Sequence, residues 1–370
     1  MNTLKITHLT SAHPRYDTRI FVKECCSLAK VSHYHVSLVV ADGKGDEHIN
    51  GVDIIDIGVP SGGRISRMTT TTKKVFLKAK ELNSTLYHLH DPELIPVGIK
   101  LKKLGKKVIF DIHEDVPKQI LAKPYLNTFT KQIISTLYAS YEKRASRRFD
   151  ALVTPTPTIN RRFKQINPRS VEVANYPIIE ELSNTTLWQE RENRLCHIGS
   201  LAESRGVIEI VDALAYSHLP LDLCGNFRPQ SLQDKAQASE GWSYVDFHGF
   251  ISRDEVNTIL KQVKIGLVTL HPTPSYLEAI PVKMFEYMAA GVAVIASDFP
   301  IYRELLQGYE CALFVDPLDP KAIADASKQL MQDQSKMEQM GKIGKTAVMQ
   351  KFNWAQEEQK LYELYRELLS

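Results

Sequence analysis

Long hydrophobic runs are missing from this sequence of 370 residues. Nothing in it approaches the roughly eighteen uninterrupted apolar residues of a membrane-spanning helix. The first residues, MNTLKITHLTSAH, also lack the apolar core and cleavage site of a secretory signal. Hydrophobic residues make up 43% and charged residues 24%, as in a globular enzyme. We therefore expect a cytoplasmic protein that is long enough to form two domains of ordinary size.

Cysteine is scarce as well, with five residues in the whole chain. The number is odd and the spacing matches no ligand pattern, which argues against a disulfide framework and against a zinc ribbon. We expect reduced thiols, most of them in the core. The five positions are Cys25, Cys26, Cys196, Cys224 and Cys311.

Negative charge is scarce in the first half of the chain. Residues 1–175 carry 28 Lys and Arg against 16 Asp and Glu, a net charge of +12, whereas residues 176–370 carry 18 against 27, a net charge of −9. Aromatic residues are not interleaved with the basic runs, so nucleic acid is not the expected partner. We expect this basic half to contact a phosphorylated acceptor or the anionic cytoplasmic face of the inner membrane, peripherally.

Strand-like and helical segments alternate in both halves. A helix is predicted from about Thr18, capped by Asp17, and two others begin near Val207 and Arg253. Such alternation predicts parallel sheets flanked by helices, and hence two doubly wound α/β domains. Ligands in these folds bind beyond the carboxyl ends of the strands. The predicted strands are 4–9, 35–41, 84–90, 106–112 and 151–155, then 194–200, 219–225, 244–249, 265–270, 292–297 and 311–316.

Polar side chains cluster at two strand ends of the first half. A His-x-His pair, His88 and His90, ends one predicted strand, and His113 follows another, with acidic residues close to both. This combination is compatible with the metal site of a hydrolase, which stays open as an alternative. The later strand ends supply no similar cluster, so no metal is expected. The neighbouring carboxylates are Asp91, Glu93, Glu114 and Asp115.

The stretch PSYLEAIPVKMFEYMAAGVAVIAS, residues 274–297, places Glu278 and Glu286 on either side of a predicted helix start at Pro281. Glu286 falls among large apolar neighbours, where a carboxylate is costly unless it is paired. Lys283 opposes the helix dipole in the first turn, and an anion bound at the helix start would resolve this. The alternative is an exposed glutamate and a solvated lysine on an amphipathic helix.

Together these residues resemble the retaining, nucleotide-sugar-dependent glycosyltransferases of family 4, which have the GT-B fold. Glu278 and Glu286 match the E-x7-E pair of that family, HIGSLAESRGV matches its phosphate loop, and VDFHGFISRDEV matches its nucleobase loop. The resemblance covers nearly the whole chain. It implies two Rossmann-like doubly wound domains that face a central cleft. These are an acceptor domain at 1–176, a nucleotide-sugar domain at 177–351 and a return helix at 352–370 that packs on the N-terminal domain.

The resemblance also implies roles for single residues. Glu286 should accept hydrogen bonds from the ribose, and Glu278 from the donor sugar. The diphosphate should lie at the helix start, next to Lys283 and Arg205, and His113 corresponds to a histidine that contacts the sugar. The catalytic candidates are thus His113, Glu278, Arg205 and Lys283. The nucleotide-sugar contacts are expected from Gly199, Ser200, Arg205, Phe250, Ile251, Glu278, Ile280, Val282, Lys283 and Glu286.

Two departures from the family pattern concern cations. The family often has Arg directly after the glycine of the phosphate loop and Lys five residues later, whereas this chain has Ser200 and Arg205. The Gly-Gly loop that usually follows the first strand is replaced by TSAHPRYDTRIF. We expect Arg15 or Arg19 to take over its phosphate contacts. The acceptor-side candidates are Arg15, Arg19, His90 and Asp91.

The activity that the resemblance implies is transfer of a hexosyl or N-acetylhexosaminyl group. The donor would be a UDP- or GDP-linked sugar, and the acceptor a hydroxyl of a saccharide, lipid-linked, in the assembly of a bacterial-type surface polysaccharide, O-antigen or lipopolysaccharide. Neither a metal nor another cofactor is expected. A nucleotide-sugar epimerase on a related fold, which would need no acceptor, is the second reading.

Overall fold

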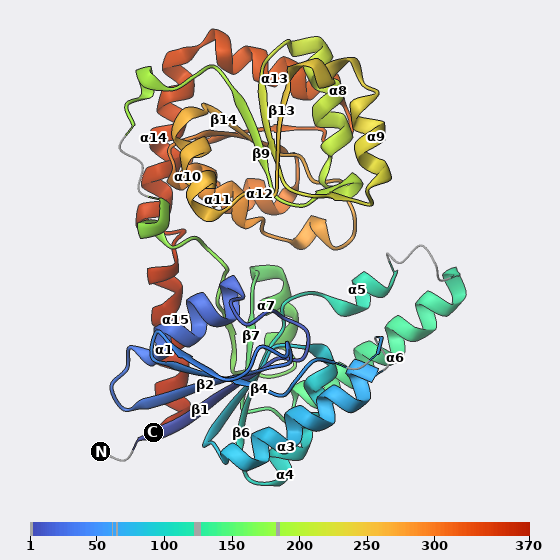
Figure 1. Ribbon diagram of the computed structural model, residues 1–370, viewed down its shortest axis with the longest axis vertical. Helices are drawn as coiled ribbons and strands as arrows, with labels where there is room; N and C mark the ends of the chain where they lie inside the picture. Colours follow the sequence, from blue (N-terminus) through green and yellow to red (C-terminus); the bar gives the residue numbers. More distant parts are fainter. Residues whose placement is uncertain (1–2, 61, 64–65, 122–126, 183–185) are drawn as a thin grey trace. The chain divides into compact units, whose positions relative to one another are not determined.

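The computed structural model describes residues 3–60, 62–63, 66–121, 127–182 and 186–370. The chain forms two compact units (Figure 1). Unit 1 comprises Met1–Asn175 together with Ala355–Ser370, and unit 2 comprises Tyr176–Trp354. The chain passes from unit 1 to unit 2 between residues 175 and 176 and returns to unit 1 between residues 354 and 355. The sequence predicts these boundaries at 176/177 and 351/352.

Unit 1 is built on an eight-stranded sheet with the order β3-β4-β2-β1-β5-β6-β7-β8. All neighbours in the described part of this sheet are parallel except β3 and β4. The strand order reverses at β1, which lies between β2 and β5, and such a switch point opens a crevice at the carboxyl ends of the strands. The strands are β1 (Leu4–Leu9), β2 (Tyr34–Val40), β3 (Glu47–Ile49), β4 (Val52–Asp56), β5 (Leu86–Leu89), β6 (Lys107–Asp111), β7 (Ala151–Thr154) and β8 (Ser170–Glu172).

Helices cover both faces of this sheet. The first begins as a π-helical segment, where the Asp17 carboxylate accepts bonds from the backbone N–H groups of Arg19 and Ile20, so the predicted cap is confirmed. The helical elements of unit 1 are η1 (Thr18–Cys25), α1 (Cys26–Ala29), η2 (Arg67–Thr71), α3 (Thr72–Leu82), η3 (Pro92–Leu94), α4 (Ile95–Lys103), α5 (Val116–Leu121), α6 (Thr128–Ser146), α7 (Pro157–Lys164) and α15 (Trp354–Leu369).

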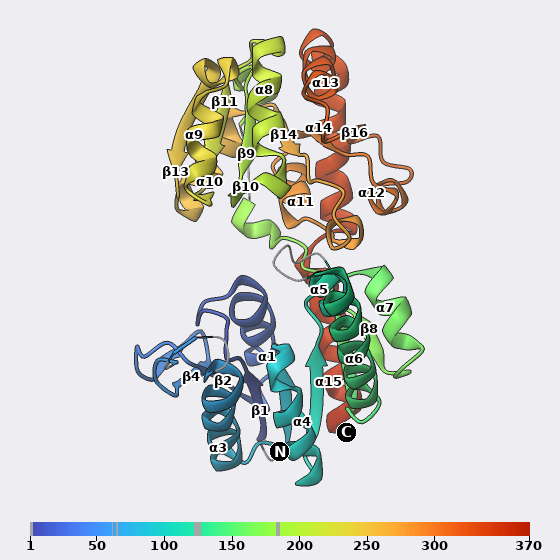
Figure 2. The same cartoon turned by 90° about the vertical axis from the view of Figure 1, so that its right-hand side faces the viewer.

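The two faces of the unit 1 sheet differ in polarity at β1 and β5. Side chains alternate between the faces along a strand. Leu9 and Leu89 belong to the apolar core that includes Val75 and Ala79 of α3, whereas His8 and His88 lie against Tyr365 of α15. Figure 2 shows α3 and α15 on different sides of β1.

Helix α15 is an integral part of unit 1. The apolar side chains on its inner face, which recur at helical spacing, are all 4% exposed or less. Polar contacts add to this packing: Glu358 accepts a bond of 2.8 Å from the Ser27 hydroxyl, and Glu357 accepts one of 2.8 Å from the backbone N–H of Ala174. The buried apolar positions are Trp354, Leu361, Leu364, Tyr365 and Leu368.

Unit 2 contains a six-stranded parallel sheet with the order β13-β11-β9-β14-β15-β16. Here the strand order reverses between β9 and β14. The strands are β9 (Leu195–Ile198), β11 (Leu221–Cys224), β13 (Val245–Gly249), β14 (Ile265–Val268), β15 (Ala293–Ser297) and β16 (Ala312–Val315), with β10 (Leu201–Ala202) and β12 (Phe227–Arg228) as a separate pair. The helical elements are η4 (Ile179–Leu182), η5 (Trp188–Glu190), η6 (Glu203–Arg205), α8 (Val207–Ser217), α9 (Ser231–Gln237), η7 (Glu240–Tyr244), α10 (Arg253–Gln262), η8 (Tyr276–Glu278), α11 (Val282–Ala289), α12 (Pro300–Leu305), α13 (Pro320–Gln332) and α14 (Gln334–Gln350).

Two expectations from composition can be compared with the structure. All five cysteines are free thiols, and four of them are buried, as predicted; Cys26 is half-buried. Within the described part of the chain, no helix is both long enough and apolar enough to cross a membrane.

Candidate functional site

A pocket of about 340 Å³ opens at the carboxyl edge of the unit 2 sheet. It lies beyond β9, β11 and β13, next to the start of α11. Five of the nucleotide-contact residues expected from the sequence line it: Gly199, Ser200, Phe250, Ile251 and Lys283. These residues come from three separate segments of the chain, and the parallel sheet brings the segments to one edge.

Glycine shapes the backbone beside this pocket. A Cβ atom on Gly225 would lie 1.7 Å from the carbonyl oxygen of Gly199, and one on Gly206 would lie 2.2 Å from the carbonyl oxygen of Thr269. Gly206 also has a φ angle of +73°, which favours glycine. The loops that follow β9, β11 and β14 can therefore pack against one another only with glycine at these positions.

Glu286 is buried in α11, with 6% of its surface exposed. Arg253 lies 2.6 Å and Lys283 2.8 Å from its carboxylate oxygens. Burial would raise the pKa of Glu286, but the two cations outweigh it and hold the pKa below its ordinary value. The unfavourable Lys283 in the first turn thus has an ion-pair partner, and the reading of Glu286 as an exposed helix residue is wrong.

Glu278 ends the short turn η8, four residues before the first residue of α11, and is half-buried. Ile280 and Val282 follow it and are also half-buried. Arg205 ends η6, and its guanidinium lies 5.9 Å from the centre of the Tyr276 ring. In the part of the chain that the structure describes, none of these residues is in the wall of the 340 Å³ pocket. Glu286 is connected to the pocket through Lys283, which lines the wall, whereas its other partner, Arg253, does not.

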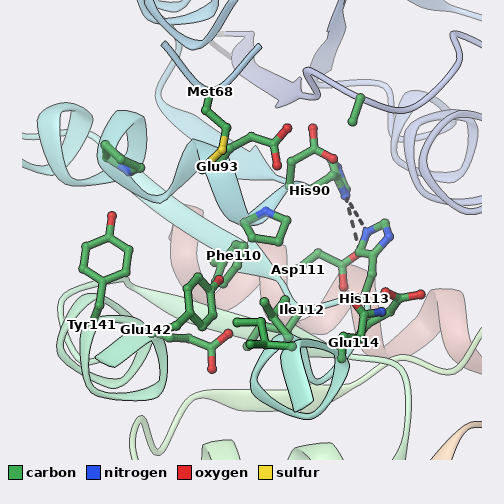
Figure 3. A pocket seen from close by; sticks show the side chains of 18 of the residues that line it. Met68, His90, Glu93, Phe110, Asp111, Ile112, His113, Glu114, Tyr141 and Glu142 are labelled. Atoms are coloured by element: carbon green, nitrogen blue, oxygen red, sulfur yellow. Dashed lines mark hydrogen bonds and ion pairs between the residues drawn. The ribbon is translucent and has the colours of Figure 1, made fainter. Parts of the chain in front are cut away.

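A second pocket, of about 770 Å³, lies in unit 1. It opens beyond the carboxyl ends of β5 and β6, with α5 and α6 as further walls. His90 and His113 lie on one side of this pocket, and Tyr141 and Glu142 lie on the other (Figure 3). The side formed by the strand ends and the loop after β1, here called the polar end, contains His13, His90, Asp91, Asp111 and His113; the side formed by α5 and α6, here called the apolar end, contains Ile120, Ile134, Tyr138 and Tyr141 together with the carboxylate of Glu142.

His113 is the accessible member of a charged group at the polar end. Its Nε2 lies 2.9 Å from Asp111, and 19% of its side chain is exposed. Arg19 donates two hydrogen bonds to the same carboxylate, at 2.8 and 2.9 Å. Burial would raise the pKa of Asp111, but Arg19 and then His113 hold it well below its ordinary range. Asp111 therefore remains an ionised acceptor that holds the His113 ring in place.

Comparison with known proteins identifies the family. A family model described as Glycosyl transferases group 1 matches residues 178–347, and one described as Glycosyltransferase Family 4 matches residues 22–178. The chain is a family 4 glycosyltransferase. An uncharacterized glycosyltransferase of Methanocaldococcus jannaschii is 23% identical in an alignment of 356 positions that covers 87% of this chain and 87% of the relative.

Solved structures agree on the fold of the transferase. Sucrose-phosphate synthase of Thermosynechococcus elongatus superposes with a TM-score of 0.80 at 16% identity, over 99% of both chains. HepE of Anabaena in complex with UDP superposes with a TM-score of 0.74 at 14% identity, over 98% of this chain and 100% of the other. Two parallel-sheet α/β units and these neighbours show the GT-B fold that the sequence predicts.

The structure corrects the expected roles of two arginines of the transferase. Arg15 donates to Asp42 at 2.8 and 2.7 Å and to Glu47 at 2.9 Å, and Arg19 spends its donors on Asp111 and on the carbonyl oxygen of Val173. Both are buried, at 4% and 5% exposure. Because their donors are used within unit 1, the prediction that either takes over a phosphate contact is wrong.

Asp91 and His90, the other acceptor-side candidates, lie at the pocket but are mostly engaged inside the transferase. Asp91 accepts bonds from the loop after β1, at 2.8 Å from the Thr10 hydroxyl and 2.5 Å from the Ser11 N–H, and it pairs with His13 at 2.8 Å. His90 is 1% exposed and lies 2.8 Å from a ring nitrogen of His8. These residues therefore shape the loop and the pocket wall.

Two groups of side chains in unit 1 have the composition of a metal site: His8, Glu24, His88 and His90, and then His90, Asp111 and His113. The guanidinium of Arg19 lies next to both groups, because its Nε is 2.8 Å from Asp111 and 3.3 Å from Glu24. A bound cation would be repelled by this fixed guanidinium. The expectation that no metal binds here stays a prediction.

Sequence reasoning missed three residues at the unit 2 site. Arg253 pairs with Glu286, and Arg228 and Asn226 line the pocket beside Ser200. Asn226 lies two residues after β11 and Arg228 four residues after it, in β12, so a systematic reading of the residues after each predicted strand could have found them. Arg253 lies within the predicted nucleobase loop, but its pairing with Glu286 depends on the fold, which brings the start of α10 close to α11.

Proposed function

We propose that this transferase moves a sugar from a nucleoside diphosphate to the hydroxyl of a saccharide acceptor, with retention of anomeric configuration. The observation that carries the proposal is the convergence of the predicted phosphate loop, nucleobase loop and helix start on one pocket of unit 2. Arg228, in the same wall, adds a cation that can offset the missing arginine at Ser200. The neighbour HepE was solved with UDP, which supports a UDP-linked donor.

The two glutamates receive separate roles in this proposal. Glu286 is kept ionised by Arg253 and Lys283 and would accept hydrogen bonds from the ribose hydroxyls. Glu278 would accept hydrogen bonds from the transferred hexosyl or N-acetylhexosaminyl group. The N–H groups of Ile280 and Val282, at the start of α11, would meet the diphosphate. Lys283 and Arg205 would offset the negative charge that grows on the leaving group.

Chemistry of this kind needs neither a carboxylate nucleophile nor a metal. The acceptor hydroxyl would attack the anomeric carbon on the face from which the diphosphate departs, and the leaving phosphate oxygen would take the proton of the hydroxyl. His113, oriented by Asp111, would hydrogen-bond a hydroxyl of the transferred sugar. We expect dialysis against a chelator to leave the turnover unchanged, and restoration by an added divalent cation would contradict that.

The shape of the unit 1 pocket supports a lipid-linked acceptor. Its polar end suits a sugar, and its apolar end suits a hydrocarbon chain. Helix α6 forms part of the apolar wall and also carries exposed apolar residues at four-residue intervals, which places them on one face. Phe129 is 76% and Leu137 65% exposed, and Ile133 and Tyr141 complete the stripe.

Two exposed basic residues follow this stripe: Arg144 in the last turn of α6, and Arg148 just beyond the end of the helix. An apolar stripe that ends in cations suits the headgroup region of an anionic bilayer. The sequence-based expectation is peripheral contact through basic side chains, with no inserted helix. We propose in its place that α6 lies in the interface with its apolar stripe among the lipids. This arrangement fits a transferase of bacterial-type surface polysaccharide, O-antigen or lipopolysaccharide assembly, at the inner membrane.

The deciding experiment is a donor screen that measures released nucleoside diphosphate with and without a lipid-linked saccharide extract. We expect release from one UDP- or GDP-linked sugar to depend on the extract. Release without any acceptor dependence, or conversion of the donor into its epimer, would contradict the proposal and favour the epimerase. A parallel screen of melting temperature with the free nucleotides tests the donor pocket alone, because a ligand at a hundred times its dissociation constant adds about 2.7 kcal/mol.

A further inference from the structure

The apolar end of the unit 1 pocket contains two polar atoms that have no partner. Tyr138 and Glu142 lie one turn apart on α6, so their side chains share a face of the helix. The Tyr138 hydroxyl and the Glu142 Oε1 atom are both buried, and neither has a hydrogen-bond partner among the residues that the structure describes. Both residues line the pocket of about 770 Å³.

The arrangement around Glu142 keeps this oxygen unsatisfied. Arg162 donates to the other carboxylate oxygen at 2.8 Å and to Asp115 at 2.6 Å, so the carboxylate is held from one side only. Burial raises the pKa of Glu142 to about 7, although Arg162 acts against it. A buried acceptor without a donor is costly, and such groups in native proteins usually serve a ligand, an ion or a water.

The chemistry of the surrounding wall narrows the choice of ligand. Further acidic residues, Glu93 and Glu114, line the same pocket. Arg67 also lines it and pairs with Glu93 at 2.6 Å, but the lining carboxylates outnumber this cation, so an anionic ligand would still be repelled. Aromatic and aliphatic side chains make up most of the remaining wall. A molecule that offers hydroxyl donors on a partly apolar body matches this wall, and that is the chemistry of an uncharged sugar. Water would occupy these positions in its absence.

Figure 3 shows where this end lies relative to the polar end. Tyr141 and Glu142 are on one side of the pocket, His90 and His113 are on the other, and Phe110 and Ile112 lie between them. A ligand that reached both ends would be longer than one sugar ring. The pocket volume permits this, because it falls in the usual range of ligand sites, roughly 300–1,000 Å³.

We propose that Tyr138 and Glu142 form a binding subsite for an uncharged sugar residue of the acceptor, away from the residue that receives the transferred sugar. Glu142 Oε1 accepts a hydrogen bond from a hydroxyl of this sugar, and the Tyr138 hydroxyl makes a second bond to it. The identification of this ligand as part of the acceptor rests on the proposed function. The binding of an uncharged sugar at this subsite does not depend on it.

The test uses the full-length protein without nucleotide and measures saturation-transfer NMR with three probes, the methyl β-glycosides of glucose, galactose and N-acetylglucosamine. We expect at least one to bind, and methyl β-glucuronide to bind at least about tenfold more weakly than the glucoside at pH 8. Glu142→Gln and Tyr138→Phe should each weaken the bound glycoside about tenfold. Tyr216→Phe, which removes the hydroxyl of an exposed tyrosine of unit 2 outside this pocket, should leave the affinity unchanged.

Failure of all three glycosides to bind would overturn the proposal, and so would binding that Glu142→Gln and Tyr138→Phe leave unaltered. A signal that Glu278→Gln abolishes instead would assign the sugar to unit 2 and overturn it as well. Glycoside binding that depends on Glu142, in a protein that releases no nucleotide with any acceptor, would uphold the subsite and reject the proposed transfer. The two failures are thus distinguishable.

Discussion

The Tyr365 hydroxyl, on α15, lies 2.8 Å from Nδ1 of His88, on β5. The same hydroxyl lies 3.2 Å from Nε2 of His8, on β1. The contacts continue from Nδ1 of His8 to Nε2 of His90, at 2.8 Å, and from Nδ1 of His90 to Asp111, at 3.4 Å. The C-terminal helix is therefore connected through buried rings to the carboxylate that holds His113.

The charge of Asp111 sets the direction of the bonds in this chain. An ionised carboxylate only accepts, so Nδ1 of His90 carries its proton and Nε2 of His90 accepts from His8. Nε2 of His8 then accepts from the Tyr365 hydroxyl, whose oxygen accepts from Nδ1–H of His88. Burial lowers the pKa of all three histidines, that of His90 to about 4, so each ring is neutral at pH 7.

Tyr365→Phe should therefore disturb unit 1 beyond the loss of one contact. It leaves the buried Nε2 of His8 without a donor, which costs about 1 to 3 kcal/mol. We expect a lower melting temperature and altered His8 and His90 signals in long-range ¹H–¹⁵N NMR spectra. Tyr362→Phe is the matched control, because the Tyr362 hydroxyl donates to the carbonyl oxygen of Ser27, which is not part of this series of hydrogen bonds. If spectra of the unsubstituted protein placed the proton of His90 on Nε2, they would contradict the assigned direction of these hydrogen bonds.

Acid should destabilise the protein through the same histidines. Their pKa values are lowered in the folded state, so below about 6.5 the unfolded chain binds protons that the folded chain does not. Each such histidine removes about 1.4 kcal/mol of stability per pH unit, down to its own folded pKa. His13, whose pKa is raised by Asp91 against the effect of burial, acts in the opposite sense. Urea unfolding at pH 7.5 and pH 5 checks this, and equal midpoints would refute it.

Glu286→Gln should weaken the binding of the free nucleoside diphosphate as well as the donor. The substitution removes the ribose acceptor and leaves Arg253 and Lys283 without their counter-charge, so a loss of roughly 1.5 to 3 kcal/mol is expected. Glu278→Gln should leave the free nucleotide nearly untouched and lower kcat. Calorimetric titration of both variants decides between the roles. Equal nucleotide affinity in Glu286→Gln and in the parent would remove the ribose assignment.

Glu142→Gln should stabilise the protein at pH 8. Burial raises the pKa of Glu142 from its ordinary value of 4.5 to about 7, so stability falls as pH rises through this interval, where the unfolded chain loses the proton first. The amide avoids that cost, and we expect a gain of about 1 to 3 kcal/mol at pH 8 and little change at pH 4.5. Thermal unfolding at both pH values measures it. A variant less stable than the parent at pH 8 would mean that the carboxylate is structural.

Leu137→Glu should weaken the binding of vesicles that contain anionic lipid. Leu137 lies within the exposed apolar stripe of α6, and a carboxylate there would be repelled by the lipid headgroups and excluded from the acyl region. Leu77→Glu is the matched control, since Leu77 on α3 is also exposed, at 55%. Sedimentation with vesicles at low and high salt measures both effects. An equal loss in the two variants would exclude a specific role of α6.

Much of the fold could be predicted from the sequence because each β/α unit is defined locally. The predicted strand 4–9 coincides with β1, and the helices expected near Val207 and Arg253 begin at those residues. The antiparallel pair β3 and β4 was missed, although Asn50 and Gly51 in its turn adopt positive φ angles of 52° and 76°. An Asn-Gly pair is a known hairpin signal, and the short flanking strands obscured it.

The site was less predictable because charge partners come from distant parts of the chain. Arg15 lies in the loop after β1 and Arg19 in the first turn of η1, where the resemblance predicts phosphate contacts, yet Asp42 and Asp111 engage them. Nothing in the local sequence distinguishes an arginine held by a buried carboxylate from one that is free for a ligand. Glu142 was not predicted for the same reason. Its proposed role depends on the Oε1 atom, which has no hydrogen-bond partner among the described residues that surround it in the fold.

The order of synthesis differs from the order of completion in this chain. Unit 2 is continuous from Tyr176 to Trp354, whereas unit 1 takes its last helix from residues 355–370. On the ribosome, residues 1–175 emerge first, but the surface formed by His8 and His88 remains uncovered until Tyr365 has been made. Unit 2 can therefore finish folding while unit 1 still waits for its final element, and nascent chains stalled before residue 355 should expose the histidine face of the first sheet to chaperones.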